Sequence, residues 1–221
     1  IFKEIRAKNK IINAPLKKVF QTNMRGVILT IAAGGITSVS AYIIMTFVGV
    51  FFKSVLMYDA NEALYYGAVG NALLVVFLPL MGMVSDRLGY STSMVVSSIL
   101  LCFFAIPFFK MLGSGDPFSI HLGIGILALI VSLNYAPLYP FMLRLFKPEQ
   151  RYSGIACCLN LGIATFGGCS NMIYIALIQY TGQLHAPAYY VSFMSILFVV
   201  TLMLLKRTGS ISSYSEAKQY I

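Results

Sequence analysis

Charged residues are scarce in this sequence: they make up 10% of its 221 residues, whereas hydrophobic residues make up 58%. A soluble domain carries about 25% charged residues. Together with a mean hydropathy of +0.81, this shortage excludes an ordinary soluble domain and indicates an integral membrane protein. Tryptophan is absent, so tyrosine and phenylalanine have to supply the aromatic belt at the membrane surfaces.

Residue types that bind metals or act as nucleophiles are also few. The four cysteines lie inside apolar runs and show no metal-ligand spacing with either histidine. The sequence contains no phosphate-binding loop and no nucleophile–base pair, so we expect no metal site, no cofactor and no enzymatic activity. The net charge of +9 would suggest nucleic acid for a soluble chain. Here the basic residues flank apolar runs, so we expect no nucleic-acid partner.

Six apolar runs separate the remaining charges, and each is long enough to cross a hydrocarbon core of about 30 Å as a helix. We therefore predict an all-α membrane protein in which the lipid bilayer is the first partner. It has a basic cytoplasmic arm over 1–25, a six-helix transmembrane bundle over 26–205 and a polar cytoplasmic tail over 206–221. The predicted spans are 26–52, 64–84, 91–109, 121–143, 153–178 and 186–205.

Basic residues gather at one end of these spans. Six spans put both termini on the same side. That side holds seven Lys and Arg residues in the arm, one after the second span, three between the fourth and fifth spans, and three in the tail. These are fourteen of the sixteen in the chain. Because Lys and Arg are enriched in cytoplasmic loops, both termini are expected in the cytoplasm.

A short charged loop interrupts the long apolar stretch from 63 to 109. Its only charged residues are Asp86 and Arg87, so the chain has to leave the membrane there. Because the loop is short, the flanking spans should be antiparallel neighbours. We predict that Gly82 permits close helix contact, that Asp86 caps the next helix, and that Gly89 allows a tight backbone.

The same cytoplasmic side carries two arginines after the fourth span, Arg144 and Arg151. We predict that Asp86 pairs with one of them in a contact that breaks and re-forms as the protein changes state. The alternative is that the loop serves membrane insertion only.

Polar side chains recur in the middle of the spans. Amide and hydroxyl groups can bind a carboxylate, and aromatic faces can bind a cation, so this set suits a small zwitterion. The alternative is that these groups only form hydrogen bonds between helices. The predicted cavity residues are Tyr42, Thr46, Asn71, Asn134, Tyr135, Tyr139, Asn160 and Asn171.

None of the six predicted spans contains Asp, Glu, Lys or Arg. A carboxylate relay for proton coupling therefore has no group in these spans. The lack of arginine within the spans also favours a zwitterionic solute over a dianion.

Three motifs together resemble a known family. Residues 82–89 read Gly-Met-Val-Ser-Asp-Arg-Leu-Gly and resemble the cytoplasmic loop signature of the major facilitator superfamily. Residues 148–154 read Pro-Glu-Gln-Arg-Tyr-Ser-Gly, and they continue into Asn-Leu-Gly at 160–162 and Phe-Gly-Gly at 166–168. With Thr-Gly at 181–182 and Ala-Pro-Ala-Tyr-Tyr at 186–190, this pattern is similar to the metabolite–proton symporter branch. That branch includes carriers of proline and glycine betaine, shikimate and 2-oxoglutarate.

The resemblance implies a fold and a function. Carriers of this superfamily have two six-span bundles around a central cavity, and this chain resembles the carboxy-terminal bundle only. The resemblance implies that the chain is part of a proton-coupled symporter of proline and glycine-betaine-type osmolytes. Such a symporter works by alternating access in a bacterial inner membrane. Protons and a second six-span half are the further partners implied. The alternatives are a carrier of small carboxylates, one half encoded by a split gene, or a truncated remnant that does not transport.

Overall fold

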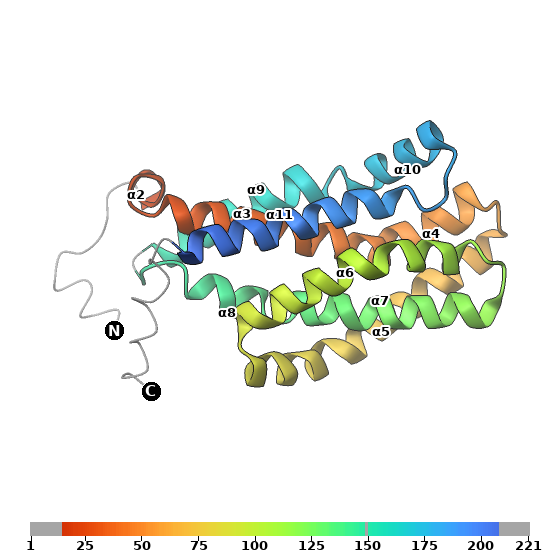
Figure 1. The fold of residues 1–221 in the computed structure, drawn as a ribbon, viewed down its shortest axis with the longest axis horizontal. Coiled ribbons are helices and arrows are strands. Elements are labelled where there is room, and N and C mark those ends of the chain that lie inside the picture. The colour runs from red at the N-terminus through yellow and green to blue at the C-terminus, as the bar shows by residue number, and fades with distance from the viewer. Residues whose placement is uncertain (1–14, 149, 208–221) are drawn as a thin grey trace.

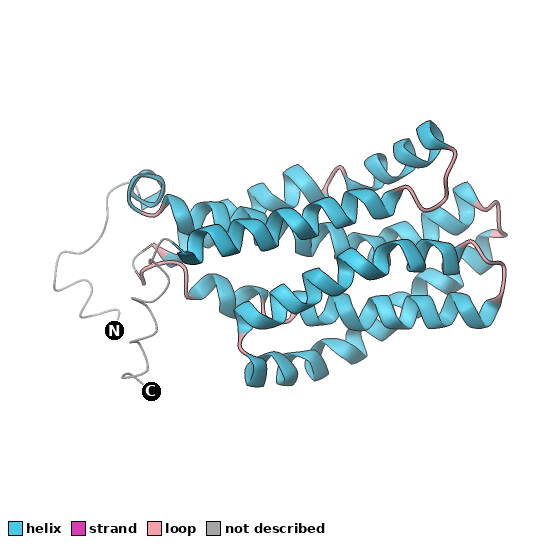
Figure 2. Cartoon of the chain, in the orientation of Figure 1, coloured by secondary structure: helices cyan, strands magenta, loops and turns pink. Residues whose placement is uncertain are grey.

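The computed structural model describes residues 15–148 and 150–207 (Figure 1). In this part of the chain every regular element is helical (Figure 2). The described residues contain six helical columns, each a run of one or more consecutive helices, that are long and apolar enough to cross a membrane, which confirms the predicted all-α fold class. Most of the predicted basic arm, over 1–14, and most of the predicted polar tail, over 208–221, lie outside the described residues.

The first column has the most interruptions. A short helix, α2 (Pro15–Thr22), precedes it. The column itself consists of α3 (Met24–Tyr42), a π-helical segment η1 (Ile43–Phe47), the short α4 (Val48–Val50) and a second π segment η2 (Phe51–Val55). It is the most buried of the six and lies at the centre of the bundle.

The other columns pack around it and leave one face exposed, on which Thr46 lies. The second is α5 (Ala60–Leu88) and the third is α6 (Tyr90–Leu112). The fourth is α7 (Pro117–Tyr135) followed by α8 (Leu138–Leu143). The fifth consists of α9 (Arg151–Gly162), η3 (Ile163–Gly167) and α10 (Ser170–Thr181), and the sixth is α11 (Pro187–Arg207).

Prolines act differently in the second, third and fourth columns. Pro79 lies inside α5, and α6 continues past Pro107 to its last turn, so neither ends its helix. Pro137, in contrast, lies in the break between α7 and α8. Proline removes a backbone donor and clashes with the preceding turn, which explains why a break at this position is stable.

Small residues let the central column approach its neighbours closely. A Cβ atom added to Gly162 of α9 would lie 2.5 Å from the carbonyl oxygen of Ile31 in α3, and one added to Gly34 would lie 2.9 Å from Leu159. Without an appreciable hydrophobic force between helices in lipid, such close backbone packing is a main source of association. The pairing of α3 with α9 therefore depends on glycine.

The second and third columns pack differently from the prediction. They are antiparallel, as their short connection requires, but each contacts α7 much more extensively than it contacts the other. The long helix α7 thus lies between α5 and α6, while α11 packs against α6 and α3. The loop length fixed the direction of the two helices but not their neighbours.

Candidate functional site

One row of hydrogen bonds crosses the exposed face of the bundle and joins three columns. Asn171 of α10 donates from Nδ2 to the Thr46 hydroxyl at 2.8 Å, and that hydroxyl donates to the Tyr42 carbonyl at 2.9 Å. On the other side, Asn71 of α5 donates to the carbonyls of Gly67 at 2.9 Å and Met45 at 3.4 Å. Four of the predicted cavity residues, Tyr42, Thr46, Asn71 and Asn171, are therefore brought together.

The π segment η1 forms the middle of this row. Thr46 is exposed within it, while Phe47 beside it is fully buried. A π turn changes the direction of side chains relative to an α-helix and is frequent at functional sites. The Oδ1 atom of Asn171 is buried without a partner among the described residues. Unpaired buried acceptors of this kind are uncommon in native structures.

A groove of about 520 Å³ opens beside the row, between the first column and α5. A volume of 300 to 1,000 Å³ is typical of sites for small molecules. Its polar lining groups are Thr46, Lys53, Ser54 and Asn71, and the rest of the lining is apolar.

Lys53 was not among the predicted site residues. The prediction ended the first span at Phe52 and treated the lysine as a flank, but the helix continues through Lys53 to Val55. Continuing an α-helical pattern past Phe52 would have placed Lys53, seven residues after Thr46, near the same face, and both residues line the groove.

Asn134 is not on this face, and its predicted place in the cavity is wrong. Its side chain is 0% exposed. Its Oδ1 accepts a hydrogen bond from Thr37 at 2.7 Å, and its Nδ2 donates to Ser97 at 2.9 Å and to Ser98 at 3.3 Å. The residue therefore ties α7 to α3 and α6 inside the bundle, as the alternative interpretation of the polar residues expected.

The three remaining predicted cavity residues lie near the surface, outside the hydrogen-bonded row. Asn160 is exposed and donates only to Ala156 in its own helix at 2.7 Å. Tyr139 is 53% exposed, and Tyr135 is half-buried. The structure leaves their role in a cavity as a prediction.

The loop motif takes a different form from the predicted one. Asp86 and Arg87 belong to the last turn of α5 and are exposed. The N-cap of α6 is Gly89, with no side-chain capping bond, so the prediction that Asp86 caps this helix is wrong. Gly89 has φ +88°, a region that favours glycine, which agrees with the predicted tight backbone.

The predicted pairing of Asp86 with an arginine is also absent from the described residues. The Arg144 guanidinium lies 4.5 Å from the centre of the Tyr90 ring, in a cation–π contact. Arg151 donates from Nε to the Phe146 carbonyl at 3.3 Å. A Cβ added to Gly82 would meet nothing within 4 Å, so Gly82 makes no close helix contact in this bundle, contrary to the prediction.

These findings predict the outcome of Asp86→Asn. Because Asp86 forms no helix cap and no ion pair with the described residues, the variant should unfold at the wild-type temperature in detergent. Arg144→Gln, which removes the cation–π contact, is the comparison and should unfold at a lower temperature. A clear drop for Asp86→Asn would show that the carboxylate holds the bundle together after all.

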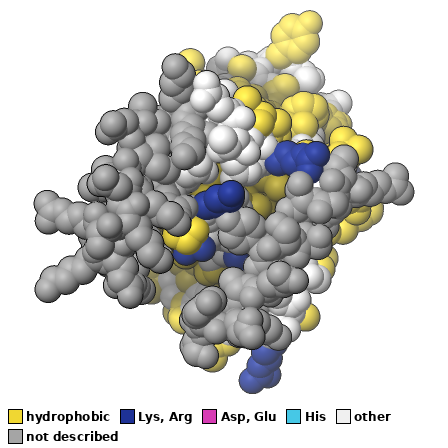
Figure 3. Space-filling view, turned by 90° about the vertical axis from the view of Figure 1, so that its left-hand side faces the viewer, with side chains coloured by type: hydrophobic (Ala, Val, Ile, Leu, Met, Phe, Trp, Pro, Cys, Tyr) yellow, Lys and Arg dark blue, Asp and Glu magenta, His cyan; other side chains and the backbone are white. Residues whose placement is uncertain are grey.

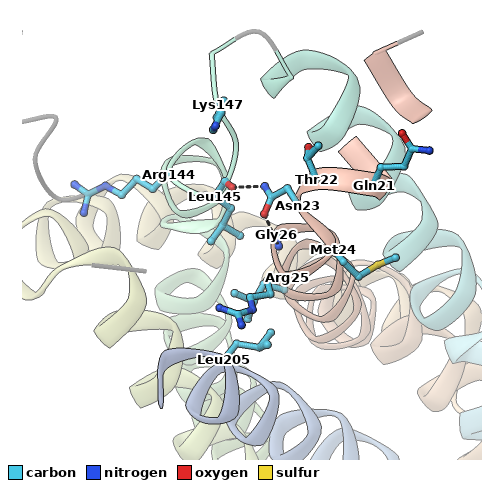
Figure 4. A pocket seen from close by; sticks show the side chains of 11 residues that line it. Gln21, Thr22, Asn23, Met24, Arg25, Gly26, Arg144, Leu145, Lys147 and Leu205 are labelled. Carbon is cyan, nitrogen blue, oxygen red and sulfur yellow. Dashed lines mark hydrogen bonds between the residues drawn. The ribbon is translucent and has the colours of Figure 1, made fainter. Parts of the chain in front are cut away.

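A second pocket, of about 440 Å³, lies at the end of the bundle where α3 begins (Figure 4). Asn23 organises its wall: Nδ2 donates to the Leu145 carbonyl at 2.7 Å, and Oδ1 accepts from the Gly26 amide at 3.1 Å. Arg25, Arg144 and Lys147 also line it, and Arg144 points away from Asn23 in this view. The described residues contain no group of three or more His, Cys, Asp or Glu residues that could hold a metal ion.

Comparison with characterised proteins identifies transporters as relatives. The chain is 27% identical over 201 residues to the citrate–proton symporter of Klebsiella pneumoniae, covering 89% of this chain and 45% of the symporter. It is 27% identical over 195 residues to a glycine betaine/proline/ectoine/pipecolic acid transporter of Dickeya dadantii, covering 84% of this chain and 38% of the relative. It is 25% identical over 195 residues to the proline/betaine transporter of Salmonella typhimurium, covering 88% and 39%. No family model and no solved structure matches the chain.

The lengths of these relatives matter as much as their names. The chain spans less than half the length of the relatives it matches, which agrees with a likeness to one of two bundles. The resemblance to the metabolite–proton symporters is confirmed. The relatives are transporters and not enzymes, as predicted.

Proposed function

We propose that this chain, a relative of citrate–proton and proline/betaine transporters, is the carboxy-terminal half of a proton-coupled symporter that works by alternating access. The observation that carries this proposal is the hydrogen-bonded row on the exposed face. Polar groups facing lipid are costly, so this face favours contact with a second bundle and an aqueous cavity between the two.

The solute that we propose is a small zwitterion of the proline or glycine-betaine type. Thr46, Asn71 and Asn171 would provide polar contacts, and the aromatic faces of Tyr42, Tyr135 and Tyr139 would receive the cationic end. Asn160 would lie on the same cavity face. The row contains no carboxylate, so the proton-coupling groups would come from the second half.

We further propose that both termini face the cytoplasm of a bacterial inner membrane. One end of the bundle holds the start of α3, the end of α11, the α5–α6 turn and the α8–α9 connection. Lys and Arg side chains are visible on this end in Figure 3, and the topology predicted from the sequence assigns fourteen of the sixteen basic residues of the chain to this side. Membrane-impermeant labelling of intact cells that reached a cysteine placed at Arg151 would contradict this orientation.

We propose that the predicted contact of Asp86, which breaks and re-forms as the protein changes state, is made with the second half and acts as a cytoplasmic gate. The residues of this gate would be Gly82, Asp86, Arg87, Gly89, Arg144 and Arg151. Gly82 has open space above it, and Asp86 is exposed, so both are available to another surface. Loss of uptake by an Asp86→Asn carrier that keeps normal stability would support this role, and unchanged uptake would favour a role in insertion only.

Uptake measurements test the cavity. In cells that express the complete carrier, Asn171→Ala and Thr46→Val should each reduce uptake of radiolabelled proline or betaine by about tenfold, because each breaks the row and removes a group that would contact the solute. The matched control is Ser195→Ala, since this buried serine bonds only within its own helix, to the Val191 carbonyl. If all three variants transport at the wild-type rate and expression level, the row is structural.

A further inference from the structure

The groove between the first column and α5 has a single charged lining group. Met45, Val50, Leu64 and several alanines and glycines form most of its surface, and Lys53 and Ser54 lie in η2. A mostly apolar groove with a few polar groups is the usual form of a small-molecule site, in which the polar groups fix the orientation of the ligand.

Lys53 is aligned with the hydrogen-bonded row. It lies two helical turns beyond Thr46, and both residues line the groove, as does Asn71 on the opposite wall. The two π segments η1 and η2 contain Thr46 and Lys53 respectively, so both departures from α-helical geometry in this column supply groove residues.

Within the described part of the chain, Lys53 forms no ion pair. Asp59 and Glu62 are the acidic residues nearest in sequence, at the start of α5. Asp59 accepts a hydrogen bond from the Asn61 amide at 2.9 Å and caps α5. Lys53 is exposed, and its ammonium group therefore has its three donors available for a charge-assisted hydrogen bond with a solute that enters the groove.

We propose that this groove binds the carboxylate group of the transported solute and that Lys53 is its counter-ion. The inference rests on the proposed transport function and deepens it by naming the chemical group that this half recognises. One lysine neutralises one carboxylate, the Ser54 hydroxyl can donate to the second oxygen, and the long 3.4 Å bond from Asn71 to Met45 is easily exchanged for a bond to the solute. The groove is large enough to admit a solute the size of an amino acid.

The direct test is Lys53→Gln in the complete carrier, with Lys53→Arg as the conservative variant. For proline or betaine, Lys53→Gln should raise KM by about tenfold or more, and Lys53→Arg should retain most of the affinity. The control is Lys110→Gln, because Lys110 is also exposed at the same end of the bundle, in the last turn of α6, but does not line the groove.

A second readout separates recognition from a structural effect. Prolinamide lacks the carboxylate of proline. In the wild type, unlabelled proline should therefore inhibit uptake of the radiolabelled solute much more strongly than prolinamide does. The Lys53→Gln variant should be inhibited by the two compounds to a similar extent, whereas a misfolded carrier would bind neither compound. The same uptake measurement with citrate distinguishes a carrier of zwitterions from a carrier of polyanions. The KM for whichever solute the wild type takes up should depend on Lys53.

The outcomes are distinguishable. If the wild type transports a tested solute and Lys53→Gln keeps both KM and discrimination, Lys53 is only an interfacial anchor, and the inference fails while the proposed function stands. If the wild type transports none of these solutes, and none of them raises the unfolding temperature of the purified carrier, the proposed function and the inference both fail.

Discussion

Replacing Gly162 with alanine should lower the free energy of unfolding of the bundle by about 1–3 kcal/mol, the usual cost of forcing an extra group into a packed interior. The new Cβ would lie 2.5 Å from the Ile31 carbonyl oxygen and 3.1 Å from the Gly35 amide nitrogen, and both are backbone atoms that cannot rotate away. The columns containing α3 and α9 would have to separate, and the contacts on both sides of the glycine would weaken. Unfolding by denaturing detergent measures the change.

The control for this experiment is Gly125→Ala in α7. A Cβ there meets no atom within 4 Å, and alanine favours a helix over glycine by about 1 kcal/mol. We therefore expect Gly125→Ala to be neutral or slightly stabilising. If Gly162→Ala matches it, the close approach of α3 and α9 does not determine the stability of the bundle.

The second large effect is expected at Asn134. Asn134→Leu keeps the side-chain volume similar but removes three hydrogen bonds, to Thr37, Ser97 and Ser98. Each interhelical hydrogen bond in a membrane contributes about 0.6 kcal/mol, so the free energy of unfolding should fall by about 2 kcal/mol. Ser97 and Ser98 keep their bonds to the Met94 carbonyl, so Thr37 loses the most.

A double-mutant cycle with Thr37→Val isolates that contact. The double variant should lose less free energy of unfolding than the two single variants do in sum. The difference should be about 0.6–1.7 kcal/mol, the range measured for such contacts in membranes. Ser40→Ala is the control, since this buried hydroxyl bonds only to the Ile36 and Thr37 carbonyls of its own helix. Strict additivity would mean that the Thr37–Asn134 bond contributes nothing to stability.

The candidate site could be predicted only in part, and Asn134 and Lys53 show why. Both are single polar residues in or beside an apolar run, and the sequence assigned the first to the cavity and the second to a flank. Which face of a helix meets a neighbour depends on packing partners far away in sequence, such as Ser97 for Asn134. The π segments add to this, because they shift the register of side chains without a strong local signal.

The Asp86–Arg87 loop shows that the sequence also predicted contacts between residues close in sequence only in part. The sequence indicated a tight turn at Gly89, and the positive φ there follows from local geometry alone. It also suggested a capping role and an ionic partner for Asp86. The structure instead places Arg144 against Tyr90 and leaves Asp86 exposed.

The sequence by itself determined that the described chain has six helical columns able to cross a membrane, because hydrocarbon excludes charges and requires every backbone group to bond within its own segment. Those are local constraints, which run length and the position of charged residues express directly. Only the tertiary structure decided that α7 separates α5 from α6, that Asn134 lies inside, and that Lys53 joins Thr46 and Asn71 at one groove. These arrangements depend on side-chain shape and hydrogen bonding between distant segments, which hydropathy alone does not encode.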